Sequence, residues 1–240
     1  MRGFRSASMH RPLPIVASAP IFVLVLLLLP SQLEGQGWLE STQPSIGVAL
    51  GTSGLGVEAS VRPWDRLGAR LGLGWIPFEP EVDEDEVTGT ISLPSPITRL
   101  TLDYFPRAGA FHLSGGMHRF PGGVSGRAMA RDTVEINDRD YGPEELGEFT
   151  GRVWGRETAP YLGLGWQRTT GRVQPNVDLG VAFTGSPRIT VSVSGPIGAD
   201  PTFQADLDSE IREAEEDIAS FRFFPHLALG FRLRLGSTHR

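Results

Sequence analysis

The sequence predicts an all-β fold: a closed, antiparallel, up-and-down transmembrane β-barrel of about eight strands, with one amphipathic helix in its last long loop. Three observations predict it. Several segments alternate with a period of two, as half-buried strands do. One face of these segments carries Leu, Val, Phe and Trp, and the other carries Gly, Ser and charged residues. Finally, tight turns and long connections alternate along the chain.

Residues 1–37 have the composition of a secretory signal peptide. Three arginines precede an apolar run at 21–29, and that run is shorter than the roughly 20 residues that cross a bilayer. Gly35 and Gly37 are small enough to flank a cleavage site, although no Ala-x-Ala is present and the cut site stays open. We expect export through the inner membrane, and an uncleaved anchor is the alternative.

Charge and cysteine content exclude several classes of function. Residues 1–37 carry three arginines and one glutamate, so their removal changes the net charge from −6 to about −8. An acidic chain has no basic surface for nucleic acid. The absence of cysteine excludes disulfides, thiolate nucleophiles and a lipid-modified N-terminal cysteine. Residues 38–240 then fit one barrel domain.

The strand pattern is clear in residues 67–76, where Leu71 and Leu73 alternate with Arg70 and Gly72. The same alternation recurs along the chain. The eight expected strands are 45–51, 54–62, 66–76, 97–105, 109–119, 159–167, 174–184 and 224–235.

The phase of the alternation flips inside residues 45–62. A one-residue slip reverses every side chain, so the flip needs a turn or a bulge, and Gly51 to Gly54 supply turn residues. The alternative is one bulged strand, with residues 187–194 as the eighth strand. That register would place the acidic loop 77–96 in the periplasm.

The connections alternate in length. Residues 63–65, 106–109 and 168–172 form tight turns, whereas 77–96, 120–158 and 185–223 are long. With an even number of strands and both ends in the periplasm, the long loops lie outside the cell as mobile acidic segments. This plan predicts a bacterial outer membrane of the Gram-negative type.

A soluble β-sandwich is the competing fold. Its core would have to consist of Gly, Asp, Arg and His, and its wet surface of Leu, Val and Phe. A barrel in lipid removes this conflict, because hydrocarbon accepts the apolar face and the closed ladder satisfies the backbone. Aromatic residues near strand ends fit interfacial girdles: Trp64, Trp75, Tyr104, Trp166 and Phe183. The expected partner is the lipid bilayer, and the expected state is a monomer.

Four stretches resemble the small OmpA/OmpX-like outer-membrane barrels: residues 100–117, 159–166, 177–187 and 203–235. The resemblance implies the fold and the location, and it implies no catalytic residues. The last strand also resembles the signal that the barrel-insertion machinery reads, with matches at Gly230, Leu233 and Leu235. It departs from that signal by ending in leucine instead of an aromatic residue and by the tail that follows.

The polar faces of the strands place charged side chains in the barrel lumen. The candidate network consists of Glu58, Arg62, Arg70, Arg99, Asp103, Asp178, Arg232 and Arg234. Charges in so narrow a space must pair or stay hydrated. The sequence favours a structural salt-bridge network, and a narrow ion path is the alternative.

Two segments of the long loops have their own patterns. Residues 203–221 carry an apolar stripe at helical spacing, which predicts a helix that packs as a lid on the barrel mouth; a partner-binding helix is the alternative. Residues 79–86 form an acidic cluster without EF-hand spacing, so we expect a solvated loop instead of a calcium site. An extracellular or envelope partner could bind these acidic loops.

No catalytic, cofactor or metal site is predicted. His112, Ser114 and His118 share the face that lines the lumen, and no G-x-S-x-G or H-E-x-x-H motif occurs. We expect a structural or surface-interaction role without catalysis. A narrow channel or ligand-binding barrel is the first alternative, and an outer-membrane lipid-modifying enzyme is the second.

Overall fold

A computed structural model describes residues 42–77, 79–83, 87–137 and 139–235. The predicted signal peptide at 1–37 lies outside these residues, as do residues 84–86, the last three of the acidic cluster at 79–86. Within the described ranges, no helix has the length and hydropathy that crossing a bilayer requires.

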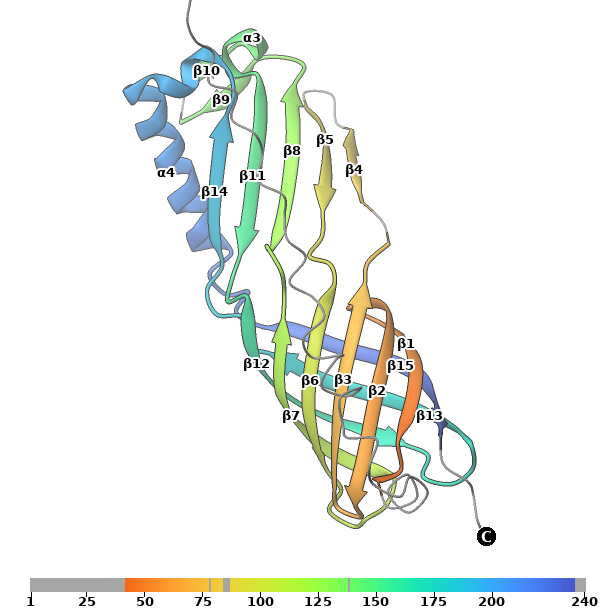
Figure 1. The fold of residues 1–240 in the computed structure, drawn as a ribbon. Coiled ribbons are helices and arrows are strands. Elements are labelled where there is room, and N and C mark those ends of the chain that lie inside the picture. Colours follow the sequence, from red (N-terminus) through yellow and green to blue (C-terminus); the bar gives the residue numbers. More distant parts are fainter. Residues whose placement is uncertain (1–41, 78, 84–86, 138, 236–240) are drawn as a thin grey trace, which may run out of the picture. The chain divides into compact units, whose positions relative to one another are not determined.

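Eight strands form one closed antiparallel barrel, which confirms the predicted fold class (Figure 1). Around the barrel the order is β1-β15-β13-β12-β7-β6-β3-β2, and β2 returns to β1. The expected boundaries agree to within one or two residues. The strands are β1 (Ser45–Gly51), β2 (Gly54–Trp64), β3 (Leu67–Trp75), β6 (Ile97–Tyr104), β7 (Phe111–Arg119), β12 (Thr158–Gln167), β13 (Val173–Ala182) and β15 (Phe224–Arg234).

The flip in residues 45–62 is a turn between two strands. β1 and β2 pair through it, with Gly51 opposite Gly54. Gly54 has a φ of 78°, a left-handed conformation that glycine adopts without steric cost. The alternative of one bulged strand is therefore wrong, and residues 188–193 lie in a different sheet.

The two faces of the barrel strands differ as the alternation predicts. Leu102 points outward and is 66 % exposed, whereas Asp103 points inward and is 2 % exposed. Trp64 and Tyr104 end their strands beside tight turns, and Trp166 is the penultimate residue of β12 beside another. Trp75 ends its strand at the opposite end of the barrel. An apolar exterior over an ionic interior is the arrangement that hydrocarbon solvent selects.

The long connections contain a second, five-stranded sheet that the sequence pattern did not predict. Its order is β14-β11-β8-β5-β4 (Figure 1). The expectation of mobile loops is thus wrong for these segments, because their short alternating runs pair only with one another, across distant parts of the chain. The strands are β4 (Glu81–Asp83), β5 (Val87–Ser92), β8 (Val124–Ala130), β11 (Glu148–Trp154) and β14 (Arg188–Val193).

The predicted helix is present as α4 (Pro201–Asp217) and ends four residues earlier than expected. Asp200 caps it by accepting hydrogen bonds from the backbone N–H groups of Phe203 and Thr202, and these bonds hold the pKa of Asp200 below its usual range. Phe221, expected in the apolar stripe, lies beyond the helix and is 71 % exposed.

The helix stripe packs on the second sheet, not on the barrel mouth as expected. Phe203 is buried against Tyr141 and Leu146, and Leu207 packs on the same cluster. This cluster joins β14 to the short elements β9 (Val134–Ile136), β10 (Arg139–Tyr141), α3 (Pro143–Leu146) and η1 (Pro196–Ala199). In addition, Glu215 accepts a hydrogen bond from the backbone N–H of Ile189, which protects the free edge of β14.

Candidate functional site

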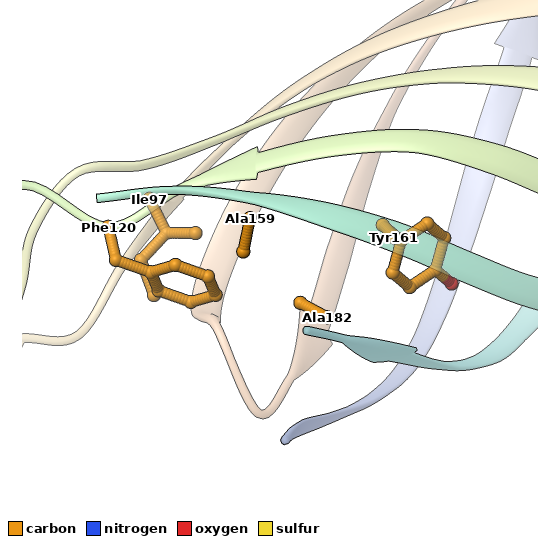
Figure 2. Close-up of a cluster of buried hydrophobic side chains, with 5 residues drawn as sticks. All are labelled: Ile97, Phe120, Ala159, Tyr161 and Ala182. Carbon is orange, nitrogen blue, oxygen red and sulfur yellow. The ribbon is translucent and has the colours of Figure 1, made fainter. Parts of the chain in front are cut away.

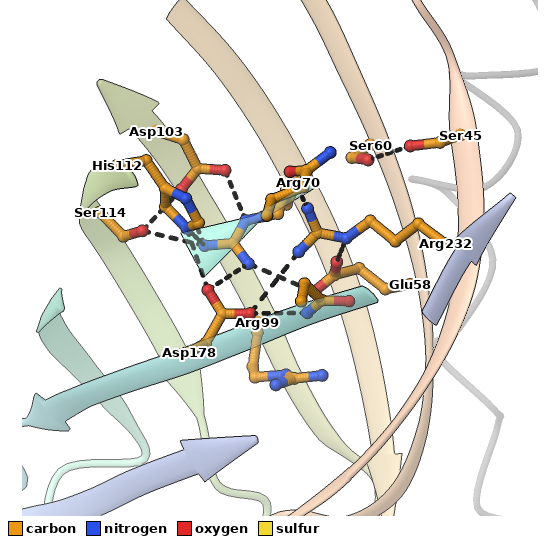
Figure 3. Close-up of polar contacts among 12 residues, drawn as sticks. Ser45, Glu58, Ser60, Arg70, Arg99, Asp103, His112, Ser114, Asp178 and Arg232 are labelled. Atoms are coloured by element: carbon orange, nitrogen blue, oxygen red, sulfur yellow. Dashed lines mark hydrogen bonds and ion pairs between the residues drawn. The ribbon is translucent and has the colours of Figure 1, made fainter. Parts of the chain in front are cut away.

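Arg70 on β3 is the centre of a polar cluster inside the barrel (Figure 3). Its Nε lies 2.5 Å from Asp103 Oδ2, and its Nη1 lies 2.8 Å from Asp178 Oδ1. Its Nη2 donates to Ser114 Oγ at 2.9 Å. Arg70 is 6 % exposed, so the guanidinium is almost fully removed from solvent and these partners replace its hydration.

Asp178 connects Arg70 to a second buried arginine. Arg232 Nη2 lies 3.6 Å from Asp178 Oδ2, and Arg232 Nε donates to Glu58 Oε1 at 2.7 Å. Asn176 Nδ2 donates to Asp178 Oδ2 at 3.0 Å, and His112 Nε2 lies 3.0 Å from Asp178 Oδ1. Each oxygen of this carboxylate therefore has several partners, which offsets the cost of burying its charge.

The structure brings together five of the eight residues that the sequence placed in the network: Glu58, Arg70, Asp103, Asp178 and Arg232. The other three face different partners. Arg99 Nη1 lies 3.1 Å from His226 Nε2, the Arg62 guanidinium lies 3.7 Å from the centre of the Phe105 ring, and Arg234 donates to the carbonyl of Thr169 at 2.7 Å.

The reason for this separation is height along the barrel. Inward residues two positions apart on one strand are about 7 Å apart, farther than an ion pair reaches. Arg99 is four positions from Asp103 on β6, about 13 Å at the strand spacing, and lies opposite His118 of β7. The alternation assigns a side chain to the interior, whereas strand register assigns it to a layer.

Three members of the cluster were not predicted as members: His112, Ser114 and Asn176. The alternation along β7 and β13 places all three side chains on the inward face, so the sequence pattern could have indicated them. A network defined by Asp, Glu and Arg leaves these three residue types out. The interior is a mixed hydrogen-bonding network as well as a set of ion pairs.

Inward glycines provide the space for these large side chains. A Cβ at Gly72 would lie 2.9 Å from Arg99 Nη2, and one at Gly165 would lie 2.6 Å from His112 Nε2. A Cβ at Gly163 or Gly180 would overlap the Tyr161 hydroxyl. The glycine-rich strings of the barrel strands are thus sites where side chains from other strands cross the lumen.

An apolar cluster closes the end of the barrel that leads to the second sheet (Figure 2). Ile97, Ala159 and Ala182 are completely buried there, with Phe120 and Tyr161 beside them. The cavity below it, lined by Arg99, His118 and His226 among others, is about 10 Å³. Another, lined by Ser45, Ser60 and Arg234, is about 20 Å³. Each of these is about the size of one water molecule.

The arrangement is suited to holding the barrel together. Its ion pairs and hydrogen bonds join β2, β3, β6, β7, β13 and β15 through the interior. Within the described ranges, no group of three or more His, Asp or Glu side chains is placed to hold a metal ion.

The residues of the expected insertion signal lie on β15 and just after it. Gly230 faces the interior, where a Cβ would lie 2.6 Å from the carbonyl oxygen of Val48. Leu233 and Leu235 are exposed on the outside. Gly230 therefore also has a packing role in the closed barrel.

Comparison with known proteins shows a similarity of fold and not of sequence. No protein-family model matches the chain, and no curated protein matches it in sequence. The crystal structure of Acinetobacter baumannii CarO matches with a TM-score of 0.52 and 16 % identity, over 80 % of this chain and 97 % of CarO. The chain has a CarO-like fold. CarO2 of the same organism gives a TM-score of 0.52 at 15 % identity, over 80 % of this chain and 99 % of its own.

Proposed function

We propose that this protein is a closed outer-membrane barrel, of the small OmpA/OmpX-like kind, with a structural or surface-interaction role and no catalysis. The observation that carries the proposal is the contrast between its two sheets. The barrel interior is filled by packed side chains, while the long connections fold into a separate sheet that can present a surface outside the cell.

The outer-membrane location is supported by the exterior of the barrel. Outward Leu and Val side chains lie between aromatic residues at both ends of the strands. The lipid bilayer is then the main partner, and the barrel-insertion machinery would read Gly230, Leu233 and Leu235. The barrel itself has no free strand edge for pairing with another copy, which favours a monomer within the membrane.

The channel alternative receives little support from the interior. Ion passage needs a continuous column of water, and the two interior cavities of about 10 and about 20 Å³ are separated by the cluster around Arg70. The enzyme alternative needs a nucleophile or base that faces lipid, whereas His112 and Ser114 face the interior and are buried.

Planar-bilayer recording tests the proposal. The refolded protein should give no conductance steps in bilayers where a known porin, used as the positive control, gives them. Folding of the same preparation is checked by the shift of its gel mobility on heating. Conductance steps from the folded protein would overturn the proposal in favour of the channel. Mass spectrometry of lipid A from an expressing strain tests the proposed absence of catalysis. Any new modified lipid A species would contradict the proposal in favour of the enzyme.

A further inference from the structure

A pocket of about 430 Å³ lies where the second sheet meets the ends of the barrel strands. It is distinct from the barrel interior. Its wall includes Phe120 at the end of β7, Glu157 before β12 and Thr184 after β13. The polar and aromatic side chains on the sheet side are Thr150, Arg152, Trp154, Arg156, Thr190 and Ser192. This volume is in the range of about 300–1,000 Å³ that small-molecule sites occupy.

The register of the second sheet explains why this wall is polar. Arg152 lies opposite Thr190 on one side and Ser125 on the other, and Thr150 lies between Ser192 and Arg127 in the same way. Side chains in these two rows share one face of the sheet. That face therefore carries hydroxyl groups and guanidinium groups in adjacent rows.

The opposite face of the same sheet is apolar. Gly151 lies between Val191 and Gly126, and Phe149 lies between Val193 and Ala128. The hydrogen-bonding groups are thus concentrated on the pocket side, whereas the apolar face contributes Phe149 and Val193 to the cluster around Phe203.

Two arginines of the pocket have free guanidinium groups. Across the described part of the chain, neither Arg152 nor Arg156 has an ion-pair or hydrogen-bond partner for its side chain, although the protein is acidic overall. By contrast, Glu157 of the same pocket is already paired with Arg119 at 2.7 Å. The unneutralised charge on this wall is positive.

Trp154 is half-buried in the wall, and its Cα and Cβ lie close to the backbone of Gly123. A Cβ at Gly123, whose φ is 71°, would lie 2.7 Å from Trp154 Cβ, so only glycine permits this contact. Trp154 therefore contributes an aromatic side chain to the same wall as Arg152 and Arg156.

We propose that this pocket binds a phosphorylated sugar. Guanidinium groups bind phosphate oxygens through paired N–H donors, hydroxyl side chains exchange hydrogen bonds with sugar hydroxyls, and an indole face covers the apolar face of a sugar ring. The inference rests on the proposed function, because a pocket at that end of the barrel would face the outer surface of the membrane. The sugar could be a soluble sugar phosphate or the headgroup of an outer-leaflet glycolipid.

Titration of the folded protein in detergent micelles tests the inference, with tryptophan fluorescence and calorimetry as readouts. Glucose 1-phosphate should bind saturably, and glucose and inorganic phosphate should each bind at least tenfold more weakly. The double variant Arg152→Gln/Arg156→Gln should lose at least tenfold in affinity, and Trp154→Phe should lose the fluorescence change. Arg172→Gln, an exposed arginine in the turn at the other end of the barrel, is the matched control and should bind like the wild type.

A second arm separates the two sources of ligand. The protein is titrated with micelles that contain phosphorylated lipid A or its dephosphorylated form. Preference for the phosphorylated form that Arg152→Gln/Arg156→Gln abolishes assigns the pocket to the glycolipid headgroup, and binding of glucose 1-phosphate alone assigns it to a soluble sugar phosphate. The inference is overturned if neither ligand binds, if inorganic phosphate binds as tightly, or if the double variant binds normally.

Failure of the pocket and failure of the proposed function are distinguishable. Bilayer recording and heat-dependent gel mobility, measured on the same preparation, report the closed barrel and do not depend on Arg152 or Arg156. A closed, folded barrel that binds none of these ligands refutes the pocket alone, whereas a conducting barrel refutes the proposed function.

Discussion

Arg70 Nη1 lies 2.8 Å from Asp178 Oδ1, and this pair spans the barrel from β3 to β13. The two strands are four positions apart in the ring of eight, so they lie on opposite sides of the lumen. The two residues are 108 positions apart in the sequence. A single ion pair thus connects opposite walls of the barrel, in addition to the hydrogen-bonded ladder around its circumference.

Removal of Arg70 should strongly destabilise the barrel. Arg70→Gln would leave Asp103 and Asp178 buried with one cation fewer, and breaking a buried pair in this way costs about 3–5 kcal/mol. Urea unfolding in lipid vesicles, followed by tryptophan fluorescence, measures the change. Arg66→Gln, at an exposed arginine in the turn before β3, is the control and should change stability by less than about 0.5 kcal/mol. Equal stability of the two variants would contradict the role given to Arg70.

Two adjacent glycines of β7 should respond very differently to the same substitution. A Cβ at Gly116 would overlap the carbonyl oxygen of Leu100 and lie 2.8 Å from Thr101 Cα, whereas a Cβ at Gly115 would make only an ordinary 3.7 Å contact with Leu162. Gly116→Ala should therefore destabilise the barrel by about 1–3 kcal/mol. Gly115→Ala should be nearly neutral in the same unfolding assay. The reverse order would refute the assigned faces of β7.

The cost of a charge on the outer face should depend on depth. Leu100 and Leu67 are both exposed, but Leu100 lies in the middle of β6 and Leu67 begins β3 at a tight turn. Leu100→Arg should cost about 2–4 kcal/mol in lipid vesicles, and Leu67→Arg about 0–1 kcal/mol. The same two variants in a water-soluble protein would show no such gradient. Equal costs would argue against the bilayer as the solvent for this face.

Docking of α4 should weaken in acid. Asp206 accepts hydrogen bonds from Asn137 Nδ2 at 2.8 Å and Tyr141 Oη at 3.2 Å, and these bonds, together with the charge of Arg139, hold the pKa of Asp206 below its usual range. A depressed pKa gives stabilisation that is fully present above the unfolded-state value of about 3.9 and is lost as the pH falls through the folded-state value.

Hydrogen exchange of the α4 amides measures this effect. Protection should be constant from pH 7 to about pH 5, after correction for intrinsic exchange rates, and should fall at lower pH. Asp206→Asn should weaken protection at pH 7 and remove most of the pH dependence. Asp208→Asn, at an exposed position of the same helix, is the control and should behave like the wild type. A pH profile that Asp206→Asn leaves unchanged would contradict the assignment.

The barrel itself could be predicted from the chain because its signal is local. Alternation such as that of Leu71 and Leu73 with Arg70 and Gly72 reports the two faces of a strand, and the turn at Gly51 to Gly54 reports where the phase changes. The position of each residue in the alternation of its strand was enough to place the side chains of Arg70, Asp103 and Asp178 in the lumen. It was also enough to count the strands, since each strand carries its own pattern.

Only the tertiary structure placed Arg99 beside His226 and joined Arg70 to Asp178, because the layers that distant strands share inside a barrel are set by the stagger of those strands. The same is true of the second sheet. Its strands pair only with one another, and the pocket lined by Arg152 and Arg156 forms where the β7–β12 connection meets the β13–β15 connection. Local periodicity gives the direction of a side chain, and long-range register gives its neighbours.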